Sequence, residues 1–309
     1  MSRIYEALRK ADLEKNIEVG AKLEAPAEPA HLLEFIGEPS PEPADLSLKD
    51  VAKRPWAPSA DVIPCLLERG LVVEQFRGLR TRLVEARQES AIKTLLISSG
   101  MPAEGKSFVA LNFAVSLARD GASRVLLIDG DLRRPTLHES LAAPRHPGLS
   151  EYLSGTAGLI EVMQQNGSQD PLFNRISNLT FIPAGASIDT SSELVTGTRM
   201  KDLITSLSPH FDWIIIDSPP VLAVTDAVDL ARVADAVLLV ARQARTPFKV
   251  AQRAQAAFKQ SRLLGIVLNA AEGVHRKSSY YYSSYYDSYY GESDRENRGK
   301  SSGKTRSKR

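Results

Sequence analysis

The chain has 309 residues, of which 43% are hydrophobic and 25% are charged, and its formal net charge is +2 at pH 7. These values are ordinary for a globular protein and allow one large domain or two small ones. So small a net charge gives no argument for binding nucleic acid. The single cysteine, Cys65, excludes an internal disulfide, and no apolar run approaches the ~18 residues of a membrane-spanning helix. We therefore expect a soluble, cytoplasmic protein.

The N-terminal region does not look like part of the main domain. Residues 1–18 are charged throughout and lack the apolar core of a signal peptide. Ile4, Leu8 and Ala11 have helical spacing, which predicts a short amphipathic helix, either a solvent-exposed helix or a docking site for a partner. Residues 19–64 are rich in Pro, Ala and Glu. Their prolines exclude a continuous helix or a central strand, so we predict a flexible linker.

Residues 65–275 have the alternating pattern of an α/β domain. Short apolar runs predict strands at residues 93–99, 124–130, 179–185, 213–220, 236–242 and 263–270. Helical patterns lie between them, at residues 107–120, 192–206, 227–234 and 249–263. Such alternation implies right-handed crossovers and a mostly parallel central sheet flanked by helices, the P-loop NTPase type of fold.

The strongest motif, G-x-x-x-x-G-K-[ST], follows the first predicted strand and precedes a helix. Its candidate nucleotide-binding residues are Gly100, Ala103, Glu104, Gly105, Lys106, Ser107 and Phe108. Backbone N–H groups of such a loop converge on phosphate oxygens at a helix N-terminus. Lys106 would bridge the β- and γ-phosphates, and the Ser107 hydroxyl would bind Mg²⁺. The alternative is a Gly/Pro turn that matches the motif by chance, but the predicted strand before it and the helix after it disfavour this. The motif predicts ATP and Mg²⁺ as cofactors.

Carboxylates follow two other predicted strands. Asp129 ends one strand and Asp131 comes two residues later, while Asp217 ends another strand. The carboxyl ends of parallel strands meet beside a phosphate loop. One carboxylate there can hold Mg²⁺ through its water shell, and another can accept a proton from a nucleophile. Each Asp alone would equally suit a helix N-cap, but three beside a phosphate loop favour an active site.

Two weaker patterns leave alternatives open. Glu74, Arg77 and Arg80 have the spacing i, i+3 and i+6, which places them on one face of a helix. By itself that is typical of an exposed, salt-bridged face. Asn269 ends the last predicted strand, where its amide either contacts adenine or has a structural role.

The tail, residues 276–309, is rich in Ser, Tyr, Gly and charge, which predicts disorder. It holds seven of the nine tyrosines: Tyr280, Tyr281, Tyr282, Tyr285, Tyr286, Tyr289 and Tyr290. The main run of basic residues follows as a separate block. A single-strand binding groove would interleave the two kinds, so we expect no nucleic acid partner.

These motifs together resemble the bacterial tyrosine kinases (BY-kinases), the cytoplasmic autokinases of capsule and exopolysaccharide assembly. Residues 100–107 resemble their Walker A motif, "LLIDGDLR" their Walker A′ and "IIIDSPP" their Walker B, and the similarity covers about residues 62–290. The resemblance implies catalytic roles for Lys106, Asp129, Asp131 and Asp217. Asp129 would be the base or positioner for the tyrosine hydroxyl, and Ser107, Asp131 and Asp217 would serve the metal. Ala103 and Phe108 depart from the usual Gly and Thr, without loss of a functional side chain.

The resemblance also implies partners. Glu74, Arg77 and Arg80 would lie between the subunits of a ring, and the tail tyrosines would be phosphorylated in trans. A separate membrane polysaccharide chain-length regulator would activate the kinase and recruit it to the inner face of the plasma membrane, and a cognate tyrosine phosphatase would reverse its action. The alternative, a partition- or division-site ATPase, usually has Lys where this chain has Met101, and it gives the tyrosines no role. A nonenzymatic scaffold would bind nucleotide without turnover.

Overall fold

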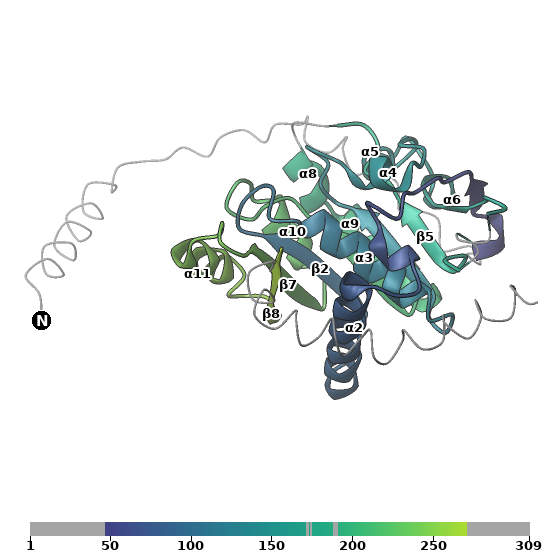
Figure 1. The fold of residues 1–309 in the computed structure, drawn as a ribbon. Helices are drawn as coiled ribbons and strands as arrows, with labels where there is room; N and C mark the ends of the chain where they lie inside the picture. The colour runs from purple at the N-terminus through teal and green to yellow at the C-terminus, as the bar shows by residue number, and fades with distance from the viewer. Residues whose placement is uncertain (1–46, 171–172, 174, 188–190, 271–309) are drawn as a thin grey trace, which may run out of the picture. The chain divides into compact units, whose positions relative to one another are not determined.

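The computed structural model describes residues 47–170, 173, 175–187 and 191–270. The predicted N-terminal helix, most of the predicted linker and the tyrosine-rich tail lie outside the described residues. The ordered domain is built on an eight-stranded sheet with the order β1-β4-β5-β3-β6-β2-β7-β8, with helices on both faces (Figure 1).

The strands follow the apolar runs of the sequence. Their bounds are β1 Ala52–Arg54, β2 Thr94–Ser99, β3 Val125–Asp129, β4 Gln164–Asn166, β5 Leu179–Ile182, β6 Trp213–Asp217, β7 Ala236–Arg242 and β8 Leu263–Asn269. Every pair of neighbours is parallel except β4 and β5. Strands β2, β3, β5 and β6 are buried along their whole length, because helices cover both faces of the sheet there. The predicted α/β fold with a mostly parallel sheet is confirmed.

The helices divide between two apolar cores, one on each face of the sheet. The first core lies under 3₁₀ helix η2 (Pro64–Leu66), α2 (Leu71–Glu89), α3 (Lys106–Ala118) and α4 (Leu137–Leu141). The second lies under α5 (Leu149–Ser154), α6 (Leu159–Val162), α8 (Ser191–Thr196), α9 (Thr198–Leu207), α10 (Asp226–Ala231) and α11 (Phe248–Ala257). Two further 3₁₀ helices are η1 (Leu48–Asp50) and η3 (Ser208–His210). The helix predicted over residues 192–206 is two helices, because Gly197 interrupts it in extended conformation as the N-cap of α9.

The predicted linker is wrong over residues 47–64. Strand β1 in this segment pairs with β4, and the Trp56 side chain is only 1% exposed. The Trp56 indole donates to Gln164 Oε1 at 3.1 Å and packs edge-on against Phe181, with 6.2 Å between ring centroids. The prolines exclude a long helix or a central strand, but they permit a three-residue edge strand and an extended segment anchored by one large aromatic residue. The ordered domain therefore includes these residues.

Across the residues that the structure describes, no helix combines the length and the hydrophobicity needed to cross a bilayer.

Candidate active site

The phosphate loop connects β2 to α3 and depends on backbone conformations in the left-handed region. Gly105 has a φ of 95°, and a Cβ at this position would lie 1.9 Å from Asn269 Nδ2. Only glycine fits such a position without displacing its neighbour. Ala103 also has a positive φ, 63°, so the residue that departs from the usual glycine adopts the conformation that glycine favours. Helix α3 begins directly after this loop, at Lys106.

A set of long-range hydrogen bonds holds the loop, and we call it the loop clamp: Glu104, Thr246, Arg242 and Asn269. The Glu104 carboxylate is 4% exposed; its Oε2 accepts from Met101 N at 2.8 Å and its Oε1 accepts from the Thr246 hydroxyl. Asn269 Nδ2 donates to Glu104 O at 3.0 Å, and Arg242 Nη1 donates to Ala103 O at 3.2 Å. The clamp thus ties the loop to the end of β8 and to the β7–α11 connection.

Sequence reasoning missed two members of the clamp. Arg242 is the last residue of β7 and Thr246 lies in the connection that follows, and no local motif marks either of them. Asn269, the predicted adenine contact, uses both ends of its amide within the protein, since its Oδ1 accepts from Ala270 N at 2.8 Å. The structural alternative for Asn269 is thereby observed, and its contact with adenine stays a prediction.

The predicted catalytic residues come together beside the loop. Asp129 and Asp217 are directly paired in register at the carboxyl ends of β3 and β6. Lys106 Nζ lies 3.0 Å from Asp131 Oδ2, 3.4 Å from Asp217 Oδ2 and 3.0 Å from Ser107 Oγ. All three carboxylates are buried. The positions of these residues at the ends of predicted strands therefore correctly predicted that their side chains lie close together.

The charges in this cluster perturb one another. Burial raises the pKa of Asp129 to about 8, and repulsion from Asp217 adds to this effect. Burial likewise raises the pKa of Asp217. For Lys106, burial alone would lower the pKa, but the nearby Asp217 and Asp131 carboxylates outweigh it and the net pKa is raised. One ammonium group facing three buried carboxylates leaves an excess of acidic groups, which favours binding of a further cation.

The residues present fit Mg²⁺ brought by a nucleotide. Asp217 Oδ1 is buried and has no hydrogen-bond partner among the described residues, which costs free energy unless a cation or water reaches it. Over the described ranges, no three His, Cys, Asp or Glu side chains gather closely enough to hold a metal alone. Mg²⁺ keeps several waters and usually shares phosphate oxygens with one or two carboxylates, so Ser107, Asp131 and Asp217 suit it.

The predicted subunit-contact residues lie elsewhere, on α2. Arg77 is ion-paired with Glu74 and donates Nη2 to Glu68 O at 3.0 Å. Arg80 Nη1 donates to Ser116 O at 2.9 Å and lies 3.4 Å from Asp120 Oδ1. The structure places these groups at the far end of α3 from Lys106, and their contact with a second subunit stays a prediction. The seven tail tyrosines fall outside the described residues.

Comparisons with known proteins agree with this site. A family model described as an AAA domain matches residues 96–250. Tyrosine-protein kinase YwqD of Bacillus subtilis is 33% identical over 226 residues, which cover 72% of this chain and 91% of YwqD. Tyrosine-protein kinase etk of Escherichia coli is 35% identical over 213 residues, 68% of this chain but 28% of the etk protein.

Solved structures give the same result. The kinase domain of the Escherichia coli tyrosine kinase ETK is 34% identical, with a TM-score of 0.59 over 64% of this chain and 74% of that domain. Three findings lead to the same conclusion. A curated tyrosine kinase is matched over nine tenths of its length, a solved kinase domain matches in structure, and a P-loop lies beside three buried carboxylates. The chain belongs to the bacterial tyrosine kinases, and it is a tyrosine-protein kinase with a P-loop NTPase fold.

Proposed function

We propose that this kinase is an ATP-dependent autokinase that phosphorylates its own C-terminal tyrosine cluster, in trans within a ring of subunits. Through this reaction it regulates the polymerisation and export of an exopolysaccharide or capsule. One observation carries the proposal: the Asp129 carboxylate is buried at the end of β3, paired in register with Asp217, which Lys106 of the phosphate loop contacts.

The properties of Asp129 suit a phenol as the nucleophile. A tyrosine hydroxyl has an ordinary pKa of about 10, and a base works best when its own pKa lies near the working pH. Asp129 Oδ1 accepts from Asp131 N at 3.3 Å and Oδ2 accepts from Leu137 N at 3.2 Å, which fixes the orientation of the carboxylate. Asp129 is thus the residue we assign to accept the phenolic proton.

The other residues position charge. When bound, MgATP supplies the phosphoryl group. The loop N–H groups and Lys106 would hold its phosphates, and Ser107, Asp131 and Asp217 would hold Mg²⁺. Because this kind of reaction depends mainly on alignment and charge neutralisation, a carboxylate base of this strength is sufficient.

The tail supplies the substrate. Seven tyrosines fall between Tyr280 and Tyr290, only ten to twenty residues after the last described residue, Ala270. A tethered segment of this length reaches an active site at high effective concentration. Each phosphate adds a charge of about −1.5 to −2, so phosphorylated tyrosines would be repelled from the acidic cluster and released.

The assembly is part of the proposal. Glu74, Arg77 and Arg80 would contact the neighbouring subunit, with the Arg side chains recognising acidic groups. A membrane polysaccharide chain-length regulator, present as a separate polypeptide, would activate the cytoplasmic kinase and bring it to the inner face of the plasma membrane. A cognate tyrosine phosphatase would reset the tail.

The decisive experiment maps phosphate on the full chain. Purified protein is incubated with labelled ATP and Mg²⁺, with and without the activator's cytoplasmic segment, and phosphotyrosine is located by mass spectrometry. We expect it between Tyr280 and Tyr290, lost in Lys106→Met and retained in the matched control Lys259→Met, an exposed residue on the surface. Absence of phosphotyrosine from this window under both conditions would overturn the proposal.

A mixing experiment tests the trans reaction. A Lys106→Met chain with an intact tail is combined with an active chain whose seven tail tyrosines are phenylalanine. Labelling of the Lys106→Met chain is expected, because only phosphorylation between molecules can produce it. An unlabelled chain would show that the reaction occurs within one molecule.

A further inference from the structure

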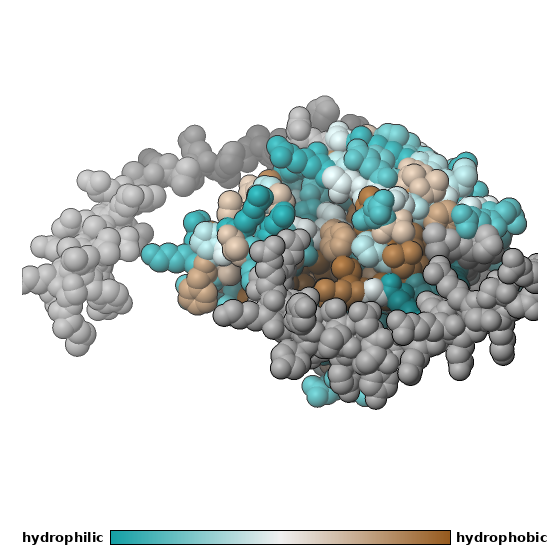
Figure 2. Space-filling model, viewed as in Figure 1, coloured by the Kyte–Doolittle hydropathy of each residue, from teal (hydrophilic) through white to brown (hydrophobic). Residues whose placement is uncertain are grey.

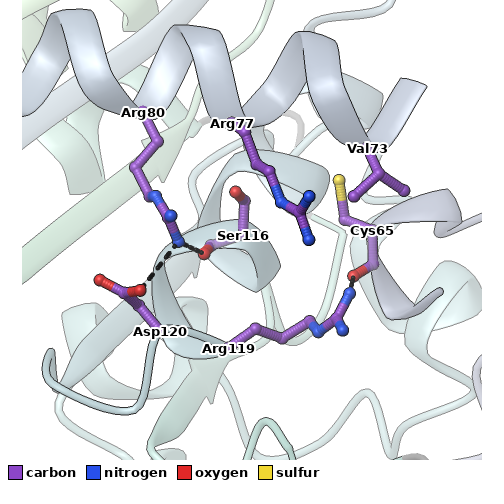
Figure 3. A pocket seen from close by; sticks show the side chains of 7 residues that line it. All are labelled: Cys65, Val73, Arg77, Arg80, Ser116, Arg119 and Asp120. Carbon is purple, nitrogen blue, oxygen red and sulfur yellow. Dashed lines mark hydrogen bonds and ion pairs between the residues drawn. The ribbon is translucent and has the colours of Figure 1, made fainter. Parts of the chain in front are cut away.

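A cavity of about 130 Å³ lies between α2 and the end of α3, and we call it the arginine cavity. Figure 3 shows Arg77 and Arg80 reaching into it from α2, with Arg119 extending from the other side and the Cys65 thiol in the wall. The remaining lining residues are Val73, Ser116 and Asp120. A cavity of this volume has room for several waters, or for one phosphate or carboxylate group.

The lining of the cavity is strongly cationic. Three of the lining residues are arginines and one, Asp120, is a carboxylate, whose side chain is 55% exposed at the rim. Outside the lining, Glu74 is ion-paired with Arg77, and the Glu68 carboxylate lies near Arg119. The pKa of Arg119 is lowered by burial and then by the positive charges of Arg175 and Arg77. The positive charges of these arginines therefore repel one another, and this repulsion adds to the effect of burial on Arg119. An anion would relieve it.

Backbone carbonyls hold two of these arginines in position. Arg80 Nη1 donates to Ser116 O, and Arg119 Nη1 donates to the carbonyls of Cys65, at 2.6 Å, and of Leu67. A guanidinium group has five N–H donors. The Nε and Nη2 donors of both side chains have no hydrogen-bond acceptor within the part of the chain that the structure describes. They are available to an oxyanion without any loss of the existing contacts.

We propose that the arginine cavity binds a phosphotyrosine of the chain's own tail, and this proposal rests on the proposed autokinase function for its ligand. The planar guanidinium fork matches pairs of phosphate oxygens. A phosphate monoester carries nearly two charges and three acceptor oxygens, and it can engage three guanidinium groups at once. A carboxylate has two oxygens and one charge, so it compensates the cluster less completely.

The surroundings also offer a surface for the tyrosine ring. Val73 lines the cavity, and Leu67 and Leu71 are 45% and 61% exposed at the end of η2 and the start of α2. Figure 2 shows hydrophobic residues gathered on the viewed face around α3 and the start of α2. An aryl phosphate has both the charge for the cavity and an apolar body for this rim.

The tail is long enough to reach the cavity. Asn269 lies against the phosphate loop, and the cavity lies at the other end of α3, a helix of 13 residues and hence about 20 Å long. Tyr280 follows Asn269 by eleven residues, which extend to at most about 40 Å. The tyrosines of a chain can therefore reach its own cavity.

Binding there has a consequence for assembly. Arg77 and Arg80 line the cavity and are also the residues that we propose to contact the next subunit. A phosphotyrosine in the cavity and the subunit contact would therefore exclude each other. A phosphorylated tail would therefore favour dissociation of the ring, because its phosphotyrosine would occupy the surface that the next subunit contacts.

The test uses a synthetic peptide of residues 278–292, SSYYYSSYYDSYYGE, with phosphotyrosine at position 285. Its binding to the full-length Lys106→Met chain, whose tail stays unmodified, is measured by fluorescence anisotropy. We expect Arg80→Gln and Arg119→Gln each to weaken binding at least about tenfold, since each removes charge-assisted hydrogen bonds. Arg82→Gln is the matched control, because Arg82 is exposed on the same helix and does not line the cavity.

Two results would overturn the proposal. Equal binding of the unphosphorylated peptide, or of a peptide with Glu at position 285, would show that phosphate is not the ligand. Equal weakening by Arg82→Gln would show nonspecific attraction to the basic surface. Should the Gln variants fail to fold, NMR spectra of the chain without these substitutions provide a second test. Peptide addition must then shift the side-chain N–H signals of Arg77, Arg80 and Arg119. Unshifted signals would reject the site.

The outcome is separable from the proposed function, because the peptide is synthetic. A chain that binds the phosphopeptide but never labels its tail would overturn the autokinase proposal and keep the binding site. A chain that labels its tail but does not bind the phosphopeptide would overturn the binding site alone.

Discussion

Substitution Thr246→Val tests whether the loop clamp stabilises the fold and prepares the site. The Thr246 hydroxyl accepts from Arg242 N at 2.8 Å and donates to the Glu104 carboxylate, and valine removes both bonds while keeping the shape. A bond to a buried charge contributes about 1.5–3 kcal/mol and a neutral one about 0.5–1.5 kcal/mol. The free energy of unfolding should therefore fall by about 2–4 kcal/mol, which lowers Tm by about 5–15 °C in a domain of this size.

Differential scanning calorimetry at constant pH measures this effect. Thr205→Val is the matched control: its hydroxyl donates to Lys201 O at 2.8 Å on an exposed part of α9, and its loss should change stability by no more than about 0.5 kcal/mol. The Kd for ATP should also rise about tenfold in Thr246→Val, because Glu104 loses a restraint next to the phosphate-binding N–H groups. A Tm decrease no larger than that of Thr205→Val would refute this account of the clamp.

Two further predictions concern stability. Asp129 has a pKa of about 8 in the folded chain against an ordinary 3.8, so between these pH values the folded state binds more protons than the unfolded state. The free energy of unfolding without nucleotide should therefore fall as pH rises through this window, and Asp129→Asn should flatten the slope in urea titrations; an unchanged slope would contradict the assignment. Trp56→Ala should lower the free energy of unfolding by about 3–5 kcal/mol, whereas deletion of residues 1–46 should leave Tm nearly unchanged. A decrease in the free energy of unfolding below about 1 kcal/mol in Trp56→Ala would indicate that residues 47–64 belong to the linker and not to the folded domain.

The central strands could be predicted because their signal is local. Strands β2, β3 and β6 are unbroken apolar runs, and burial on both faces requires such runs. Strands β1 and β4 have three residues each, "AKR" and "QQN", with neither an apolar run nor alternation. They form through pairing with residues distant in the sequence, so inspection of either segment alone could not reveal them.

The same distinction separates the parts of the site. Asp129 and Asp217 are the last residues of their strands, and Asp131 and the phosphate loop come just after strands. The fold class alone brings these positions together. Thr246 meets Glu104 across 142 residues, and Arg119 meets Cys65 across 54. These pairs contact through tertiary packing, and Thr246, Arg119 and Cys65 belong to no local pattern. Motifs therefore predicted the residues that handle the nucleotide but not the residues that restrain the loop or line the arginine cavity.

The position of the arginine cavity on α3 explains why it needs several arginines. The N-terminus of this helix carries the phosphate loop, where free N–H groups favour an anion. The cavity lies at the C-terminus of α3, where unpaired carbonyl groups repel an anion. Arg80 bonds Ser116 O in the last turn, and Arg119 is the C-cap residue itself, so both cations offset the carbonyl end. A phosphate can bind there only when cations offset these carbonyl groups. Arg80 contacts a carbonyl of α3, whereas Arg77 contacts none. We therefore expect Arg80→Gln to lose more phosphopeptide affinity than Arg77→Gln.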